Sequence, residues 1–512
     1  MDMTVESMER ESDGPWELPE GWVWTPLGKL GTWMGGGTPS KANAAFWTNG
    51  SVPWVSPKDM KVAVIGETED KITPDAVEGS SAKYVPAASV LMVMRSGILR
   101  HSFPVAVTDR VVTLNQDLRA LTPYEGVSPD YVARYLALAA KRVLDDCSKD
   151  GTTVNSIEVS ALEKLEVPLA PLAEQRRIVA RVDALFAEIA SGEAALDAAR
   201  KGLDTFRRAL LKAAVTGELT KDWRQENEKK SNPVTETGHD LLARIRSERV
   251  AKGQAKGRGK RSPDAPPLDT AALPELPEGW AWGTVDELLE FVTSGSRGWK
   301  DYYADAGAIF VRAQNINSGV LDLSDVAYVA LPSNAEGLRT RLKVGDVLVT
   351  ITGANVTVSA LVSHEIPEAY VNQHVALLRP LTIDVSDYLL LWLQAEGAGK
   401  TQLTKAAYGA GKPGLNLDNI REVLIAIPSP AEAAEILRRV SEALAASADT
   451  LAMLDAEAAD AARLKQSILK AAFEGRLVPQ DPADEPASAM LARLRATQST
   501  ARPAKRGRRR RS

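Results

Sequence analysis

Two stretches of heptad-spaced apolar residues constrain this chain more than any other feature. In residues 171–220, and again in residues 430–478, apolar side chains recur at alternating steps of three and four. This spacing predicts a long helix that packs along another helix. A helix with one apolar stripe cannot bury it alone, so the two stretches are expected to pack on each other. The positions on the two apolar series include Val182, Leu196, Leu203, Phe206, Leu210, Val440, Leu451, Leu454, Leu464 and Ile468.

The two stretches belong to a longer internal repeat. The sequence LPEGW at residues 18–22 returns 258 positions later, at residues 276–280. The same offset relates the end of the first helix, residues 209–219, to residues 467–477, and Gly217 is expected to stop the first helix. A generic buried helix that happened to occur twice would not repeat beyond the helix. The repeat therefore predicts two related halves, each a globule followed by a long helix.

Composition excludes several classes of protein. At 512 residues the chain is too long for one core, which predicts two to four domains. Its formal net charge of −5 means that any binding to a polyanion must use local patches. The single cysteine, Cys147, excludes an internal disulfide and a cysteine-based zinc finger, and the four scattered histidines offer no metal-ligand spacing. Because no signal peptide and no run of roughly 18 apolar residues is present, we expect a cytoplasmic protein without a membrane partner.

Each half, between its LPEGW sequence and its long helix, has the pattern of an α+β globule. Short β-like runs and turns fill most of it, and one helical stretch follows, near residues 131–144 or 388–404. The predicted fold class is α+β, with two globular domains separated by two long antiparallel helices that form a coiled-coil spacer with pseudo-two-fold symmetry. The predicted segments are a disordered leader (1–14), the first globular domain (15–170), the first long helix (171–220), a linker with a short helix and a basic run (221–273), the second globular domain (274–429), the second long helix (430–478), and a C-terminal segment with a short helix and a basic tail (479–512).

This layout suits a protein that reads duplex DNA at two places. Two similar readers on a spacer match half-sites that recur along a duplex. The globules share landmarks, such as residues 115–116 and 372–373 (both Asn-Gln), but the loops between these landmarks differ. The two loop surfaces are therefore expected to read different half-sites. Basic runs at 252–261 and 505–511 are typical of solvated tails that can add contacts to phosphates.

Polar and glycine-rich loops in each globule are candidates for contact with DNA. Glycines let a backbone approach phosphate closely, and Arg, Lys, Gln and Asn supply bidentate partners for base edges. Taken alone, such loops are more often plain turns. Only the duplicated layout strengthens the interpretation that they contact DNA. In the first globule the candidates are Gly36, Gly37, Thr38, Ser40, Lys41, Ser56, Lys58, Arg95, Ser96, Gly151 and Thr152. In the second they are Ser296, Arg297, Lys300, Arg312, Gln314, Asn315, Thr352 and Lys412.

Several of these motifs together resemble one family, the specificity (S) subunits of type I restriction–modification enzymes. The likeness covers nearly all of residues 16–495. It rests on the following stretches: LPEGW opening each half, GGTPS at 36–40 with WVSPKDM at 54–60, VPLAPLAEQRRI at 167–178, and LKAA at 211–214 with GEL at 217–219.

The resemblance implies a function and a set of partners. Each globule would be a target-recognition domain that reads one half of an asymmetric split site in double-stranded DNA. Two methyltransferase (M) subunits would dock on the helices, and restriction/translocase (R) subunits would join them. Methylation would be of adenine, with S-adenosylmethionine, ATP and Mg²⁺ on the partner subunits and no cofactor, metal or catalytic residue in this chain. The implied docking and coiled-coil residues are Glu174, Gln175, Ile178, Val182, Leu196, Leu203, Leu210, Val440, Leu454 and Ile468.

The second half departs from this pattern at one position. Ala433 stands where Gln175 follows Glu174 in the first half. Either the second helix docks its M subunit less well, or the glutamine is dispensable.

Enzyme activity of the chain itself finds little support in the sequence. Residues 397–401 resemble the end of a phosphate-binding loop, but Gln394 stands where its first glycine is required. Residues 409–413 end in Pro413 where Ser or Thr should hold magnesium. A non-catalytic DNA-reading subunit is the main hypothesis. The alternatives are a coiled-coil scaffold without DNA specificity, which would not bind a specific duplex, and an autonomous enzyme, which would turn over ATP or modify DNA alone.

Overall fold

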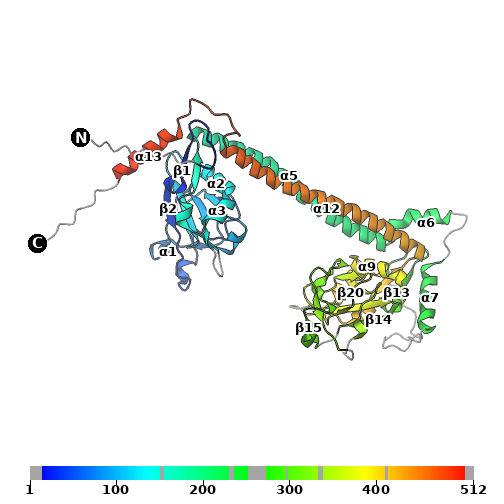
Figure 1. Cartoon of the computed structure of the whole chain (residues 1–512). Helices are drawn as coiled ribbons and strands as arrows, with labels where there is room; N and C mark the ends of the chain where they lie inside the picture. Colours follow the sequence, from blue (N-terminus) through cyan, green and yellow to red (C-terminus); the bar gives the residue numbers. More distant parts are fainter. Residues whose placement is uncertain are drawn as a thin grey trace, which may run out of the picture. The chain divides into compact units, whose positions relative to one another are not determined.

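The computed structural model describes residues 14–149, 155–229, 236–251, 273–295, 298–332, 338–409 and 413–501. The chain divides into two compact units (Figure 1). Unit 1 comprises residues 1–196 and 456–512, and unit 2 comprises residues 197–455. Each unit therefore holds one globule and a part of both long helices. None of the described helices is long and apolar enough to cross a membrane.

The globule of unit 1 is built on a five-stranded sheet whose strands carry the buried core. The central strand, Val90–Val93, is buried at all four positions, as expected for a run of apolar and β-branched residues. The sheet order is β2 (Gly31–Gly35), β9 (Leu118–Pro123), β6 (Val90–Val93), β7 (Val105–Thr108) and β4 (Val64–Ile65). A second sheet has the order β5 (Lys71–Ile72), β3 (Val52–Val55) and β8 (Thr113–Leu114), and two short pairs are β1 (Val23–Pro26) with β12 (Glu166–Leu169) and β10 (Ser148–Lys149) with β11 (Ser156–Ile157). The helices are α1 (Pro74–Glu78), α2 (Pro129–Leu138), α3 (Ala140–Cys147) and α4 (Val159–Leu162).

The globule of unit 2 repeats this plan with additional edge strands. Its main sheet has the order β14 (Leu289–Ser294), β23 (Val375–Pro380), β20 (Val347–Thr350), β21 (Ser359–Leu361), β18 (Gly319–Leu321) and β17 (Ile316–Asn317). The second sheet has the order β15 (Tyr303–Ala304), β19 (Ala327–Val329), β16 (Ala308–Val311) and β22 (Ala369–Val371), and β13 (Ala281–Thr284) pairs with β24 (Leu424–Ile427). The helices are α8 (Val285–Leu288), α9 (Ser386–Gln394), α10 (Gly399–Ala406) and α11 (Leu417–Arg421). Both globules are α+β, so the predicted fold class is confirmed.

Two helices of 44 residues each fill the predicted long-helix segments: α5 (Leu172–Val215) and α12 (Pro430–Phe473). In unit 1, Lys465 Nζ lies 2.7 Å from Glu193 Oε2, and Gln480, beyond the end of α12, contacts Glu174 at the start of α5. The residue numbers rise along one helix as they fall along the other, so the helices are antiparallel in this unit.

The same antiparallel pairing is present in unit 2. Arg200 Nη2 lies 2.8 Å from Asp455 Oδ1, and Arg439 Nη1 donates to the carbonyl of Leu219 over 2.8 Å. Figure 1 shows α12 alongside α5. Gly217 adopts a left-handed conformation (φ 76°) directly after α5, which confirms the predicted helix stop.

The apolar seam of the helix pair differs in part from the predicted heptads. Ile178, Val182, Leu210, Val440 and Ile468 are buried as expected. Leu196, Leu203 and Leu454 are only half-buried. Phe206, Leu451 and Leu464, which the heptad pattern placed on the apolar series, are 47%, 43% and 51% exposed. The pairing of the two helices therefore leaves these larger side chains in contact with solvent.

Each globule is tied to the start of its own long helix by an equivalent tryptophan. Trp22 Nε1 donates to Glu174 Oε2 over 2.9 Å in unit 1, and Trp280 Nε1 donates to Glu432 Oε2 over 2.9 Å in unit 2. The residues of the second pair lie 258 positions after those of the first. The predicted internal repeat is therefore a repeat of contacts as well as of sequence.

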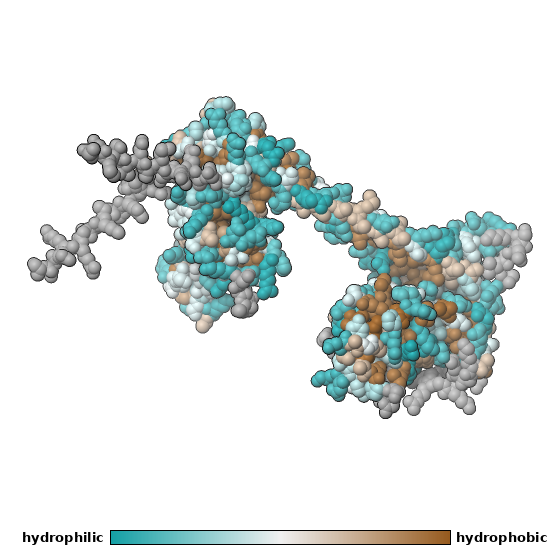
Figure 2. All heavy atoms as spheres, viewed as in Figure 1, coloured by the Kyte–Doolittle hydropathy of each residue, from teal (hydrophilic) through white to brown (hydrophobic). Residues whose placement is uncertain are grey.

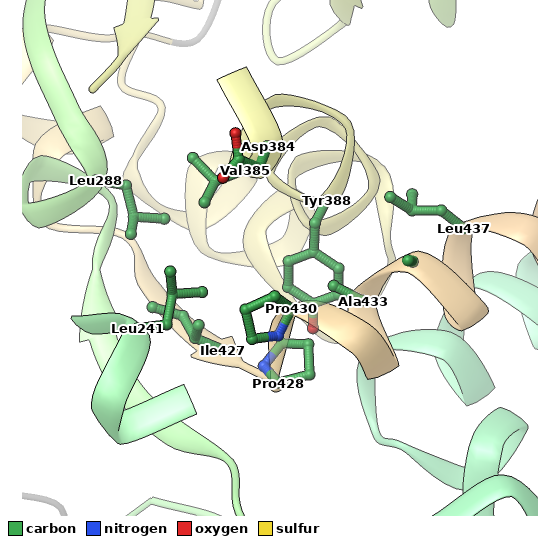
Figure 3. Close-up of a pocket in the computed structure, with 11 residues that line it drawn as sticks. Leu241, Leu288, Asp384, Val385, Tyr388, Ile427, Pro428, Pro430, Ala433 and Leu437 are labelled. Carbon is green, nitrogen blue, oxygen red and sulfur yellow. The ribbon is translucent and has the colours of Figure 1, made fainter. Parts of the chain in front are cut away.

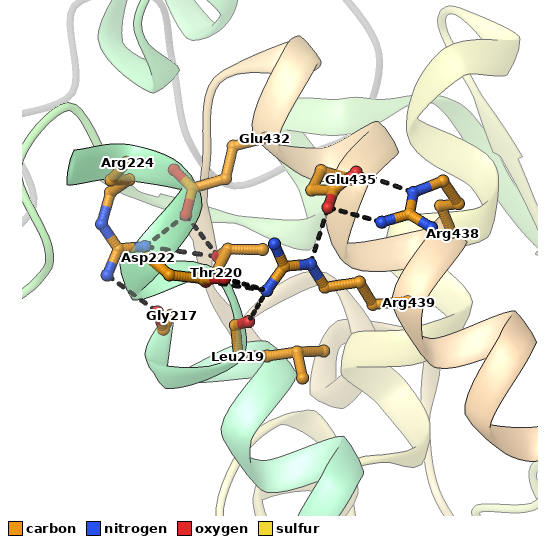
Figure 4. A network of polar contacts seen from close by, with 9 residues as sticks. All are labelled: Gly217, Leu219, Thr220, Asp222, Arg224, Glu432, Glu435, Arg438 and Arg439. Carbon is orange, nitrogen blue, oxygen red and sulfur yellow. Dashed lines mark hydrogen bonds and ion pairs between the residues drawn. The ribbon is translucent and has the colours of Figure 1, made fainter. Parts of the chain in front are cut away.

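In unit 2 the buried Glu432 belongs to a wider polar network (Figure 4). Its Oε1 accepts from the Thr220 hydroxyl over 2.7 Å and pairs with Arg224, which also donates to the carbonyl of Gly217. Arg224 lies on α6 (Lys221–Glu228), and α7 (Gly238–Ala251) follows it in the linker. The network thus joins α6 to the first turn of α12 in unit 2.

One turn further along α12, two arginines hold Glu435 (Figure 4). Hydrogen bonds from Arg438 and Arg439 lower the pKa of the Glu435 carboxyl to about 2. Arg439 also pairs with Asp222 of α6 over 2.7 Å. The ion pairs therefore extend the attachment of α6 along the helix.

Gln175 fills the equivalent joint of unit 1. Its side chain is fully buried; Oε1 accepts from the Ser128 amide over 2.9 Å, and Nε2 donates to the carbonyl of Ala170 over 2.8 Å. Glu174 beside it is 1% exposed. The side chains of Glu174, Gln175, Ile178 and Val182 therefore pack inside unit 1 and offer no surface for the docking of another subunit. For Glu174 and Gln175 the predicted docking role is therefore corrected to an internal packing role, whereas the burial of Ile178 and Val182 agrees with their predicted place in the coiled coil.

At the position of Gln175, unit 2 has Ala433 and a cavity of about 160 Å³ (Figure 3). The figure shows side chains from α12, α9 and α7 around this space, Tyr388 and Leu437 among them. The lining residues are mostly apolar. The methyl group of alanine cannot replace the glutamine amide, so the joint of unit 2 is held by the Glu432 network instead.

Candidate nucleic-acid interface

The candidate interface of unit 1 is organised around a tight turn at residues 115–117. The amide of Asn115 donates to the carbonyl of Val55 over 2.8 Å, and its buried side-chain Oδ1 accepts from the amide of Asp117 over 3.0 Å. The amide of Met94 donates to the carbonyl of Asp117 over 2.7 Å. The turn is thus held by the ends of β3 and β6, and Gln116, at its tip, is exposed.

The glycine loop predicted to contact DNA lies directly on this turn. The amide of Gly37 donates to the carbonyl of Leu114 over 2.8 Å. A Cβ atom on Gly36 would lie 1.8 Å from the carbonyl oxygen of Asn115, so this position has no room for a side chain. The glycines are therefore explained by the close approach of two protein backbones, whereas the sequence suggested approach to a phosphate. The next residue, Thr38, donates its hydroxyl to Gln116 Oε1.

Arg95 and Ser96 complete the cluster from the end of β6. Arg95 Nε lies 2.8 Å from Asp117 Oδ1, and the arginine side chain is 59% exposed. The amide of Ser96 donates to the carbonyl of Asn155 over 3.3 Å, next to residues 150–154, which the structure does not describe. Two of the predicted loops, 36–38 and 95–96, therefore meet at the turn 115–117, with a short row of polar side chains between them.

Unit 2 builds the same turn at residues 372–374. The amide of Asn372 donates to the carbonyl of Val311 over 2.9 Å, and its Oδ1 accepts from the amide of His374 over 3.0 Å. A Cβ atom on Gly295 would lie 2.0 Å from the carbonyl oxygen of Val371 and 2.4 Å from that of Asn372, which matches the glycine approach of unit 1. Gln373 is exposed at the tip, as Gln116 is.

The side chains around the two turns differ in kind. His374 stands in the place of Asp117, and Thr352 and Gly353 stand in the place of Arg95 and Ser96. Thr352 pairs with Gly414 in an isolated bridge, as Arg95 pairs with Ser156. The backbone of the site is kept in both globules while its chemistry changes.

Other predicted residues have partners inside their own globules. Ser56 is 6% exposed, and its amide and hydroxyl both donate to Asp59 Oδ2 over 2.8 Å. Lys58 Nζ lies 2.9 Å from Asp70 and 3.1 Å from Glu69, and the hydrogen bond to Asp70 raises the pKa of the lysine. These acidic neighbours already neutralise Lys58, which argues against a contact between its ammonium group and a phosphate.

The corresponding residues of unit 2 share one partner, Asp325. Arg312 lies 3.6 Å from its carboxylate, Gln314 Nε2 donates to its Oδ2 over 3.1 Å, and the buried Asn315 donates to its carbonyl over 2.7 Å. These side chains therefore hold a loop in place.

The remaining candidates are exposed or not described. Ser40, Lys41 and Lys300 are exposed. The predicted residues Gly151, Thr152, Ser296, Arg297 and Lys412, the leader 1–13, the basic run 252–261 and the tail 502–512 lie outside the described residues.

Sequence reasoning missed the residues at the centre of each cluster: Gln116, Asp117, Gln373 and His374. The signal that could have found them was the match between residues 115–116 and 372–373, two positions that the otherwise divergent globules share. Within the described ranges, no group of three or more His, Cys, Asp or Glu side chains could hold a metal ion.

A family model described as the type I restriction modification DNA specificity domain matches residues 19–197. The EcoKI specificity subunit of Escherichia coli strain K12 is 24% identical over 505 residues, which cover 94% of this chain and 96% of that one. Over most of its length this chain is similar to the specificity subunits of type I restriction–modification enzymes. The EcoR124I/EcoR124II specificity subunit of Escherichia coli is 41% identical over 160 residues, which cover 31% of this chain and 40% of that protein.

The fold is shared with a solved structure whose description concerns the complex assembly and conformational transition of the type I R-M system. The match covers 90% of this chain and 100% of the solved chain, with a TM-score of 0.60 at 17% identity. At this identity the likeness concerns the fold alone.

Proposed function

We propose that this chain is a specificity subunit that reads an asymmetric bipartite site in double-stranded DNA, one half with each globule. The observation that carries the proposal is the duplicated turn. Two globules of one strand order hold the same Asn-Gln turn by equivalent hydrogen bonds, while the neighbouring side chains differ. Two different half-sites require readers that share a backbone framework but present different polar side chains to the bases, as these two globules do.

The partners follow from the family and from the helices. Two methyltransferase subunits would dock on this chain, carry S-adenosylmethionine and methylate adenine, and restriction subunits using ATP and Mg²⁺ would join them. In unit 2, Phe206, Leu451 and Met453 of the long helices are 47%, 43% and 70% exposed. Figure 2 shows hydrophobic residues at the surface of these helices. Exposed apolar side chains of this size support a protein partner on that surface. The chain itself would contribute DNA contacts and no catalytic residue.

Methylation mapping tests this function. The chain and its methyltransferase partner are expressed together in cells without other methyltransferases, and methylated adenines are located by sequencing. A methylated motif of two defined halves separated by a gap is expected, and expression of either protein alone should give none. If the two proteins co-purify but no motif is methylated and no duplex is bound specifically, the chain is a coiled-coil scaffold instead.

A further inference from the structure

Both turns carry an exposed glutamine, Gln116 or Gln373, at the tip. The internal structure of the turns does not explain why a glutamine is present there. The turns are held by the asparagine side chain and by main-chain hydrogen bonds, and the glutamine side chain takes no part in these. Its own neighbours differ. Gln116 contacts Thr38 and Asp117, whereas Gln373 Nε2 lies 3.2 Å from His374 Nε2. Because both globules have a glutamine here although its neighbours differ, we infer that its amide group serves a purpose outside the turn.

Each amide is oriented and still has hydrogen-bonding capacity. An amide oxygen has two lone pairs and an amide nitrogen has two hydrogens. In Gln116, Oε1 accepts one hydrogen bond from Thr38, and Nε2 lies 3.4 Å from Asp117 Oδ2. One lone pair and one hydrogen remain on the exposed side. This pair matches the N6–H and N7 of adenine in the major groove.

We propose that Gln116 and Gln373 are equivalent base-reading side chains, each recognising one A·T base pair in its own half-site. The proposal rests on the proposed function, because it assumes that both globules read DNA. It also predicts a difference between the halves. Arg95, held by Asp117 and 59% exposed, can donate to guanine O6 and N7 beside Gln116, and unit 2 has the shorter, uncharged Thr352 at that place. The first half-site therefore has a G·C pair read by Arg95 that the second lacks.

Single substitutions with the methylation readout test the assignment. The variants Gln116→Ala, Gln373→Ala and Arg95→Ala are co-expressed with the methyltransferase partner, and methylated motifs are mapped. Gln225→Ala, which removes an exposed glutamine on α6, is the matched control. Loss of one bidentate contact should reduce discrimination at one base pair by about 5- to 100-fold. Gln116→Ala should relax one A·T position in one half, Gln373→Ala one A·T position in the other, and Arg95→Ala a G·C position in the same half as Gln116.

The conservative variants Gln116→Glu and Gln373→Glu separate reading from a structural role. A carboxylate accepts from cytosine N4 and cannot donate to adenine N7, so the relaxed position should shift towards C·G. A purely structural glutamine would instead lower methylation evenly at all sites, and with it the melting temperature, without changing any base preference. That result, or relaxation in both halves from one variant, would overturn the assignment even though the wild-type motif remained bipartite. Absence of a bipartite motif in the wild type would overturn the proposed function itself.

Discussion

Gln175 and Ala433 occupy equivalent positions at the two joints between globule and helix, and only Gln175 fills its joint. The glutamine bonds Ser128 and Ala170 in unit 1, whereas the alanine faces a cavity of about 160 Å³ in unit 2. The departure seen in the sequence is therefore a change of internal packing. Unit 2 compensates with the buried ion pair between Arg224 and Glu432. In unit 1 the equivalent Glu174 accepts a hydrogen bond from the neutral side chain of Gln480 instead.

Replacing Gln175 with alanine should destabilise unit 1. The substitution removes the hydrogen bonds of the glutamine to the Ser128 amide and to the carbonyls of Ala170 and Gly126, which should cost about 2–3 kcal/mol. Hydrogen exchange should show faster opening of residues 126–131 and 166–175, with unit 2 unchanged. Protection that stays at the wild-type level would mean that water or a neighbouring side chain replaces the amide.

Filling the cavity of unit 2 should have the opposite effect. Ala433→Leu adds three carbon atoms next to Leu241 and Tyr388, and burial at about 0.8 kcal/mol per carbon gives a gain of up to about 2 kcal/mol. Hydrogen exchange in α12 and α9 should slow. Ala445→Leu, at an exposed position of α12 away from the residues that line the cavity, is the control and should change little. A destabilised Ala433→Leu variant would show that the cavity cannot take a branched side chain.

The pH dependence of unit 1 should reflect Glu174. Burial raises the pKa of this carboxyl above its ordinary value. The folded state therefore binds a proton more tightly than the unfolded state, so stability is lost as the pH rises from the unfolded pKa through the folded pKa. Glu174→Gln cannot ionise. The melting temperature of the variant minus that of the wild type should therefore increase between about pH 4 and pH 7. A difference that decreases over this range would show that the ionised carboxylate stabilises the joint.

The sequence could predict features that repeat along the chain, but it could not predict contacts that only the folded structure creates. The repeat of Trp22 and Glu174 at Trp280 and Glu432 is visible in the sequence, and it correctly predicted two similar units and two long helices. The heptad pattern did not show that Phe206 is exposed, because the pattern marks one stripe of a helix and cannot say how much of it the partner covers. Lys58 was chosen for its charge alone. Its acidic neighbours at 69 and 70 were visible in the sequence, but the fold that brings them to its ammonium group was not.

Lysine substitutions should distinguish paired from unpaired charge in DNA binding. Lys58→Ala removes a lysine that Asp70 and Glu69 already neutralise, so the slope of log affinity against log salt should stay unchanged. Lys41 is exposed in the loop beside the candidate interface, and Lys41→Ala should reduce the slope by about one if the lysine contacts a phosphate. Binding of the complete methyltransferase complex to its duplex at several salt concentrations measures both. A smaller slope for Lys58→Ala would mean that the ion pairs break on binding.

The modular arrangement makes a final prediction about exchange of a globule. Replacing residues 21–170 with the matching globule of a related specificity subunit should change one half of the methylated motif and leave the other half intact, because each turn is held within its own globule. The donor must keep the tryptophan equivalent to Trp22 and the glycine equivalent to Gly126. Trp22 bonds Glu174 of α5, and a Cβ atom on Gly126 would lie 2.5 Å from the sulfur of Met490 on α13 (Ala487–Ala501). Gly126 also has a φ of 95°, which is strained for other residues, so a donor with a larger residue there should be less stable, which the melting temperature would show. If a well-folded exchange altered both halves of the motif, the two globules would have to read DNA as one composite surface.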